Sequence, residues 1–99
     1  MMDYEIFREV VKESFLSYMP ESYQDMEVRV APVDKVNRKL DGLSLLAKNE
    51  ETMISPTLYI DDMYVKYLKT EDLQATLRDA AEAMDGAFRE AAIPPLDIS

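Results

Sequence analysis

Residues 26–46 decide the fold of this chain, and they read MEVRVAPVDKVNRKLDGLSLL. Apolar Met26, Val28 and Val30 alternate with charged residues, which is the two-residue period of a strand with one buried face. Apolar residues resume over Leu40 to Leu46, where a second strand is predicted. Because only a short polar connection separates the two segments, the stretch predicts a β-hairpin.

The turn of this hairpin can be placed in two ways. Asp41-Gly42 is a common turn pair, but a turn there leaves only Leu43 to Ala47 for the second strand. The turn can instead lie at Val36-Asn37-Arg38, because Asn tolerates tight turns. We prefer this second placement, which puts Gly42 inside the strand, either at a bulge or at a point of close packing.

Prolines mark the limits of the predicted sheet. Pro32 has no N–H to donate, so it either ends the first strand or lies on a sheet edge. A third strand is predicted over Met53 to Ile60, and Pro56 in its middle makes it an edge strand or a bulged one. Short connections between the three strands predict an antiparallel sheet.

Helices are predicted on both sides of the strands. Apolar residues spaced by three or four predict a first helix from Asp3, its N-cap, to Tyr18, and Pro20 stops it. A short helix is predicted over Met63 to Lys69. Thr70 is the expected cap of the last helix, which shows the clearest apolar periodicity. Pro94-Pro95 is expected to end that helix.

These elements predict an α+β domain. A three-stranded antiparallel sheet is expected to carry two long helices and one short helix on one face, in the order α-β-β-β-α-α. The expected core joins the apolar stripes of the long helices to the inner face of the sheet. Its predicted members are Phe7, Val11, Phe15, Leu73, Leu77 and Met84 from the helices, and Val28, Val30, Leu43, Leu45, Leu58 and Ile60 from the strands.

The composition excludes several kinds of chemistry. The chain has 99 residues, a formal net charge of −9, and neither Cys nor His. These absences exclude disulfides, zinc sites built on Cys or His, and nucleophilic sites built on a His base. The length predicts a single domain, 1–99, and no apolar run approaches the ~20 residues of a membrane span. We expect a cytoplasmic protein that does not bind nucleic acid or a membrane, because its net charge repels phosphate groups.

The strand and helix that follow the hairpin resemble a known pattern. It consists of a short Gly-containing strand after an Asn-containing turn, then a Pro-X-hydrophobic-Tyr-hydrophobic strand running into an aromatic helix. The matching residues are Asn37, Gly42, Pro56, Tyr59, Tyr64 and Tyr67. The chain thus resembles the N-terminal part of a family of uncharacterised bacterial proteins, common in gut anaerobes and known as a domain of unknown function. The resemblance implies no activity, but it implies that the native chain is longer.

Asp61 and Asp62 form the first candidate site. Two adjacent carboxylates after a strand can bind Mg²⁺ or Ca²⁺, provided that Glu50, Glu51 or Asp72 supplies a third ligand. The same pair is also typical of a helix N-terminus, where acidic side chains cap the helix and complement its dipole. We favour the capping interpretation, and we expect neither a metal nor another cofactor.

Tyr59, Tyr64 and Tyr67 form the second candidate site. Tyrosine is enriched at protein interfaces, because it combines a large contact area with a polar tip. The alternative, which we favour, is packing in and around the core. The interface interpretation makes these three residues the candidates for contact with a partner.

We expect a non-catalytic interaction or accessory module. Its partner is expected to be another protein, the chain's own C-terminal region, or a second copy in a homodimer. One alternative is a fragment of a metal-dependent enzyme that uses Asp61 and Asp62. Another is an acidic inhibitor that occupies the basic groove of a nucleic-acid-binding protein.

Overall fold

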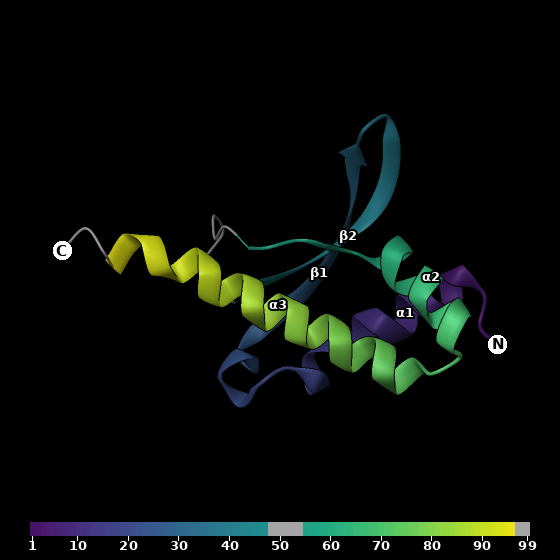
Figure 1. The fold of residues 1–99 in the computed structure, drawn as a ribbon, viewed down its shortest axis with the longest axis horizontal. Coiled ribbons are helices and arrows are strands. Elements are labelled where there is room, and N and C mark those ends of the chain that lie inside the picture. Colours follow the sequence, from purple (N-terminus) through teal and green to yellow (C-terminus); the bar gives the residue numbers. More distant parts are fainter. Residues whose placement is uncertain (48–54, 97–99) are drawn as a thin grey trace.

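A computed structural model describes residues 1–47 and 55–96, and for 92–96 it describes the backbone alone. Its elements follow the order α-β-β-β-α-α, as the sequence predicts (Figure 1). They are α1 (Tyr4–Ser14), the 3-10 turns η1 (Phe15–Tyr18) and η2 (Glu21–Tyr23), β1 (Met26–Lys35), β2 (Arg38–Ala47), β3 (Leu58–Tyr59), α2 (Ile60–Thr70) and α3 (Leu73–Leu96). The chain is therefore an α+β domain with a three-stranded antiparallel sheet.

The hairpin turns at Val36 and Asn37, which confirms the preferred placement. Both residues have left-handed backbones, with φ of 48° and 64°. Pairing runs without interruption from Lys35 opposite Arg38 to Met26 opposite Ala47, so the hairpin contains no bulge.

Pro32 lies within β1 rather than at its end. The sheet order is β1-β2-β3, so β1 is an edge strand, where a residue without an N–H is tolerated. Gly42 is a close packing point, as the second placement of the turn requires. A Cβ atom there would lie 2.7 Å from Cγ2 of Val33 and 3.0 Å from Cγ2 of Thr57.

The third strand is shorter than predicted. Only Leu58 and Tyr59 pair with β2, and Ile60 begins α2 instead of ending the strand. The predicted residues 53 and 54 lie outside the described part. Just before β3, the Ser55 hydroxyl accepts a hydrogen bond from the Leu45 N–H at 3.1 Å. Next to Pro56, a side-chain oxygen thus takes the place of the backbone carbonyl that would accept this bond in a regular strand pair.

The observed bounds of the first helix and of the short helix differ from the predicted bounds. Asp3 caps α1 by accepting from the Ile6 N–H, but the α-helix tightens into η1 at Phe15 instead of continuing to Tyr18. The short helix, α2, extends beyond its predicted bounds at both ends.

The cap of α3 and its last turn also differ from the prediction. Asp72, not Thr70, caps α3, because its carboxylate accepts from the Ala75 N–H at 3.0 Å. The Thr70 hydroxyl instead accepts from the Asp72 N–H and donates to the Lys66 carbonyl. The helix continues through Pro94-Pro95 to Leu96, so the prediction that these prolines end it is wrong.

The core lies between the helices and one face of the sheet. All twelve predicted core residues belong to it, although Leu73, Val28, Val30 and Leu58 are only partly buried. Pairing of Leu58 with Leu43 and of Tyr59 with Gly42 puts Leu58 on the core face and Tyr59 on the opposite face. Among the described residues, no helix is long and apolar enough to span a membrane.

Candidate functional site

Asp61 belongs to a cluster that we call the polar junction, formed by Tyr4, Arg8, Asp41 and Asp61. The Tyr4 hydroxyl lies 2.6 Å from Oδ2 of Asp41 and 3.2 Å from Oδ1 of Asp61. The Asp41 backbone N–H donates to the same Asp61 oxygen at 2.9 Å, and Arg8 lies 3.5 Å from Asp41. Asp61 is therefore not a helix cap, since its side chain ties α2 to α1 and β2.

The phenol of Tyr4 stays protonated in this junction. Burial, the hydrogen bond to Asp41 and the nearby charge of Asp61 raise its pKa well above the usual range. A neutral phenol has a single O–H proton, so its main hydrogen bond goes to Asp41 at 2.6 Å, and the Asp61 oxygen at 3.2 Å is the weaker acceptor. The arrangement is typical of a structural connection between three elements.

Tyr64 and Tyr67 lie together in an aromatic cluster with Phe7. The Tyr67 ring stacks on Phe7 with centroids 5.2 Å apart, and the Tyr64 ring lies 5.1 Å from Phe7. The Tyr64 hydroxyl donates to the Met2 carbonyl at 2.9 Å, and the Met2 N–H donates to the Tyr67 hydroxyl at 3.2 Å. These two candidates fix the start of the chain, and Tyr59 lies apart from them on the other face of the sheet.

Among the described residues, none supplies the third ligand of the candidate metal site at Asp61 and Asp62. Asp61 is occupied in the polar junction, and Asp72 caps α3. Glu50 and Glu51 lie outside the described residues. In residues 1–47 and 55–96, no group of three or more acidic side chains is arranged to hold a metal ion.

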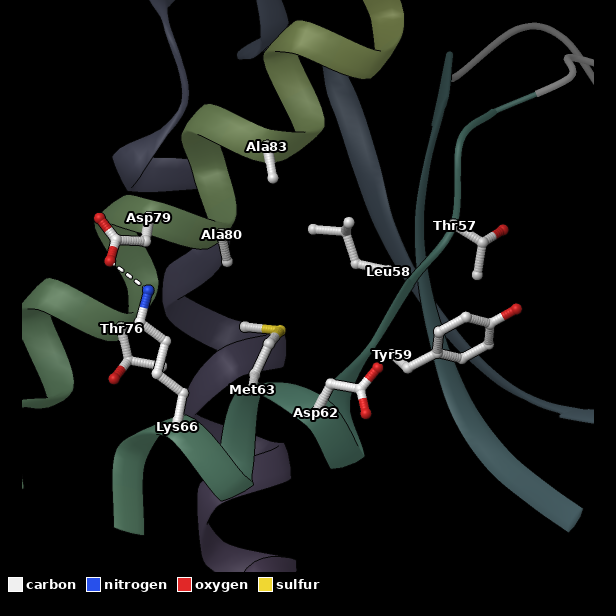
Figure 2. A pocket seen from close by; sticks show the side chains of 10 residues that line it. All are labelled: Thr57, Leu58, Tyr59, Asp62, Met63, Lys66, Thr76, Asp79, Ala80 and Ala83. Atoms are coloured by element: carbon white, nitrogen blue, oxygen red, sulfur yellow. Dashed lines mark hydrogen bonds and ion pairs between the residues drawn. The ribbon is translucent and has the colours of Figure 1, made fainter. Parts of the chain in front are cut away.

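Asp62 lies instead at the rim of a groove beside the third strand, which we call the β3 groove (Figure 2). The groove encloses about 290 Å³ between β3, α2 and α3. Its lining residues are Thr57, Leu58, Tyr59, Asp62, Met63, Lys66, Thr76, Asp79, Ala80 and Ala83. Figure 2 shows Leu58 and Met63 pointing toward Ala80 and Ala83 of α3, with the ion pair between Lys66 and Asp79 at one end. The floor is therefore apolar and the rim is charged.

Sequence reasoning missed most of this groove. Tyr59 and Asp62 were candidates, but Ala80 and Ala83 were not, because small residues in a periodic helix read as ordinary packing positions. Their spacing of three puts both on one helix face, and that shared face was the only signal that the sequence offered. Tyr4 of the polar junction was likewise not among the candidates.

The fold and the groove define this chain as a small α+β domain with a recess at a sheet edge. Residues 4–98 match the model of the family described as a family of unknown function (DUF5688). The chain therefore belongs to that family, which confirms the resemblance to a domain of unknown function. Neither the curated proteins nor the solved structures contain a significant match.

Proposed function

We propose that this chain is a non-catalytic protein-interaction module and that the β3 groove is its binding surface. The observation that carries the proposal is the position of the groove, along the outer edge of β3. In the described part of the chain, β3 is the last strand of the sheet, so its outer edge can accept another strand. Edge strands of this kind bind extended segments through backbone hydrogen bonds.

The lining of the groove defines the chemistry of the bound segment. Side chains that point from an added strand toward α3 would contact Leu58, Met63 and Ala83, so apolar residues fit there. Asp62 and Asp79 lie on the rim; Asp79 is paired with Lys66, whereas the described residues give Asp62 no hydrogen bond or ion pair. An apolar residue next to a Lys or Arg that faces Asp62 therefore complements the groove.

The other two functions have less support. The metal-dependent alternative lacks a third ligand among the described residues. The inhibitor alternative needs acidic side chains that project together, whereas Asp3, Asp61 and Asp72 are occupied as caps or in the polar junction. We propose the cytoplasm of a bacterium as the setting, with another protein or a further region of a longer polypeptide as the source of the segment.

Selection of peptides tests this proposal. The whole chain is used to select from a random library of peptides about 12 residues long, and an Ala83→Lys variant serves as the counter-target. Ala83 is exposed and lines the groove, so a lysine there fills the recess and repels cations without disturbing the core. Ala91→Lys is the matched control, because Ala91 is an exposed alanine of the same helix outside the groove lining.

The enriched peptides are expected to alternate apolar and basic residues, and to bind the Ala91→Lys variant but not the Ala83→Lys variant. Amide chemical shifts of Leu58, Met63 and Ala80 are expected to change on binding. Equal enrichment on the Ala83→Lys variant, or shift changes confined to other elements, would contradict the proposal.

A further inference from the structure

The tip of the β1–β2 hairpin contacts the rim of the β3 groove within one copy. We call residues 35–39, Lys-Val-Asn-Arg-Lys, the arm tip, and it projects beyond the helices that cover the sheet (Figure 1). Lys35 lies over the Tyr59 ring, with its Nζ atom 4.5 Å from the ring centroid. Lys35 and Arg38 also line a shallow recess of about 150 Å³ together with Asp62. Because Tyr59 and Asp62 line the β3 groove as well, the arm tip and the groove meet at these two residues.

The register of the sheet explains how Lys35 reaches Tyr59. Tyr59 pairs with Gly42 and lies on the face opposite the core. Strand positions alternate between the two faces and the pairing has no interruption, so Leu40 and Lys35 lie on that same face. Leu40 is only 8% exposed there, although it lies outside the main core cluster, and it lines the recess. The recess therefore has a buried apolar base, and its rim carries cations of the arm tip and one carboxylate.

The contact between the arm tip and the rim can be broken without unfolding the hairpin. Lys35, Arg38 and Asp62 are all exposed, and the described residues show no ion pair between Asp62 and either cation. An exposed cation–π contact contributes little in water. The strand pairing up to Lys35 and Arg38 holds the backbone of the arm in place, so only the Lys35 side chain has to move.

We propose that Lys35 is an internal competitor for the cation of a segment bound in the β3 groove. In the free chain, Lys35 and Arg38 supply the positive charge beside Asp62. A segment that brings its own Lys or Arg to Asp62 has to displace the Lys35 ammonium group from the Tyr59 ring, because like charges repel at short distance. The arm tip therefore lowers the affinity of the groove for segments that bind mainly by charge, and it favours those whose apolar residue fits the floor. This inference rests on the proposed function of the groove and concerns its regulation.

Affinity measurements on two lysine variants test the inference. The probe is the most enriched peptide of the selection described above, titrated into the whole chain and followed by calorimetry. Lys35→Met removes the charge and keeps an unbranched side chain, so this variant is expected to bind the peptide about 3–5 times more tightly. Lys39→Met is the matched control, because Lys39 is an exposed lysine of the same arm tip, on the opposite face of the hairpin and outside the lining of the recess. It removes the same charge and is expected to change the affinity by less than about 1.5-fold.

Proton NMR follows the displaced lysine directly. In the free chain, the ring current of Tyr59 is expected to move the Hε signals of Lys35 upfield from their position in a Tyr59→Leu variant. Saturation with the peptide is expected to return these signals to that position. Hε signals that stay upfield in the saturated complex would overturn the inference, and so would an equal gain in affinity in Lys35→Met and Lys39→Met.

The two proposals fail in different ways. If the peptide binds the groove of the unmodified chain and of Lys35→Met with the same affinity, Lys35 is not a competitor and the groove keeps its function. If no selected peptide shifts the amide signals of Leu58, Met63 and Ala80 in either chain, both proposals are wrong.

Discussion

Asp61 and Asp62 are neighbours in the first turn of α2, yet they face two regions built on different principles. On the side of Asp61, polar groups are paired and partly buried among α1, β2 and α2. On the side of Asp62, apolar side chains line an open groove and the carboxylate is exposed. The polar groups of the first region satisfy one another, whereas the second leaves an apolar floor and a carboxylate open to solvent. The contrast shows that identical adjacent residues can lie in two different environments.

The largest expected effect comes from truncating the centre of the aromatic cluster. It is compared with the effect of truncating the floor of the groove. Phe7→Ala is expected to lower the free energy of unfolding by about 3–5 kcal/mol, because Phe7 is fully buried between Tyr64 and Tyr67. Leu58→Ala is expected to cost about 1–2 kcal/mol, because Leu58 is only partly buried. Urea unfolding followed by circular dichroism measures both. Equal costs would mean that the groove is part of the core rather than a recess.

A matched pair of variants tests the two aspartates directly. Asp61→Ala is expected to lower the free energy of unfolding by about 1–3 kcal/mol, because the Asp41 N–H loses its partner. Asp62→Ala is expected to change it by about 0.5 kcal/mol or less. Both remove one negative charge from the same helix turn, so the effect on the helix dipole cancels in the comparison. Equal destabilisation in thermal and urea unfolding would contradict the division between the two sides.

The last expected effect is a loss of stability in alkaline solution. Burial and a hydrogen bond to Asp85 raise the pKa of Tyr23 to about 12, and the pKa of Tyr4 in the polar junction is raised as well. Because the pKa in the folded state exceeds the unfolded value of about 10, the stabilisation is complete below about pH 10 and decreases as the pH rises through about 12.

Unfolding measured across this pH range, with phenolate absorbance recorded in parallel, tests the expectation. Tyr4→Phe and Tyr23→Phe are each expected to make the decrease shallower, and Tyr18→Phe serves as the control. If stability is constant up to about pH 12 in the unmodified chain, the two phenols are not held in protonated form.

The sequence predicted those features that depend on local patterns. Strand alternation and the turn at Val36-Asn37 depend on neighbouring residues, so the hairpin was found correctly. The predicted start of β3 and the predicted cap of α3 were wrong because single side chains, Ser55 and Asp72, take over hydrogen bonds that the pattern assigned to the backbone or to Thr70. Whether a side chain can take over such a hydrogen bond depends on where the fold places it in three dimensions.

The candidate site was predictable only in part. The aspartate pair and the tyrosines were identified by type, but the sequence could not show that Asp61 and Asp62 point to different sides. The groove depends on the distance between β3 and α3, which tertiary packing sets. Its alanines carry no chemical signal of their own.

The hydrogen bonds of Met2 also constrain how this chain can fold during its synthesis. They join residues 62 and 65 positions apart. A ribosome adds about 5–20 residues per second, so about 3–13 s pass between the synthesis of α1 and that of its aromatic partners in α2. During that interval the apolar stripe of α1 lacks the surface that α2 later covers, and full docking of α1 waits for the synthesis of α2 (Ile60–Thr70). Helix α1 is therefore the segment that we expect a chaperone to protect during synthesis.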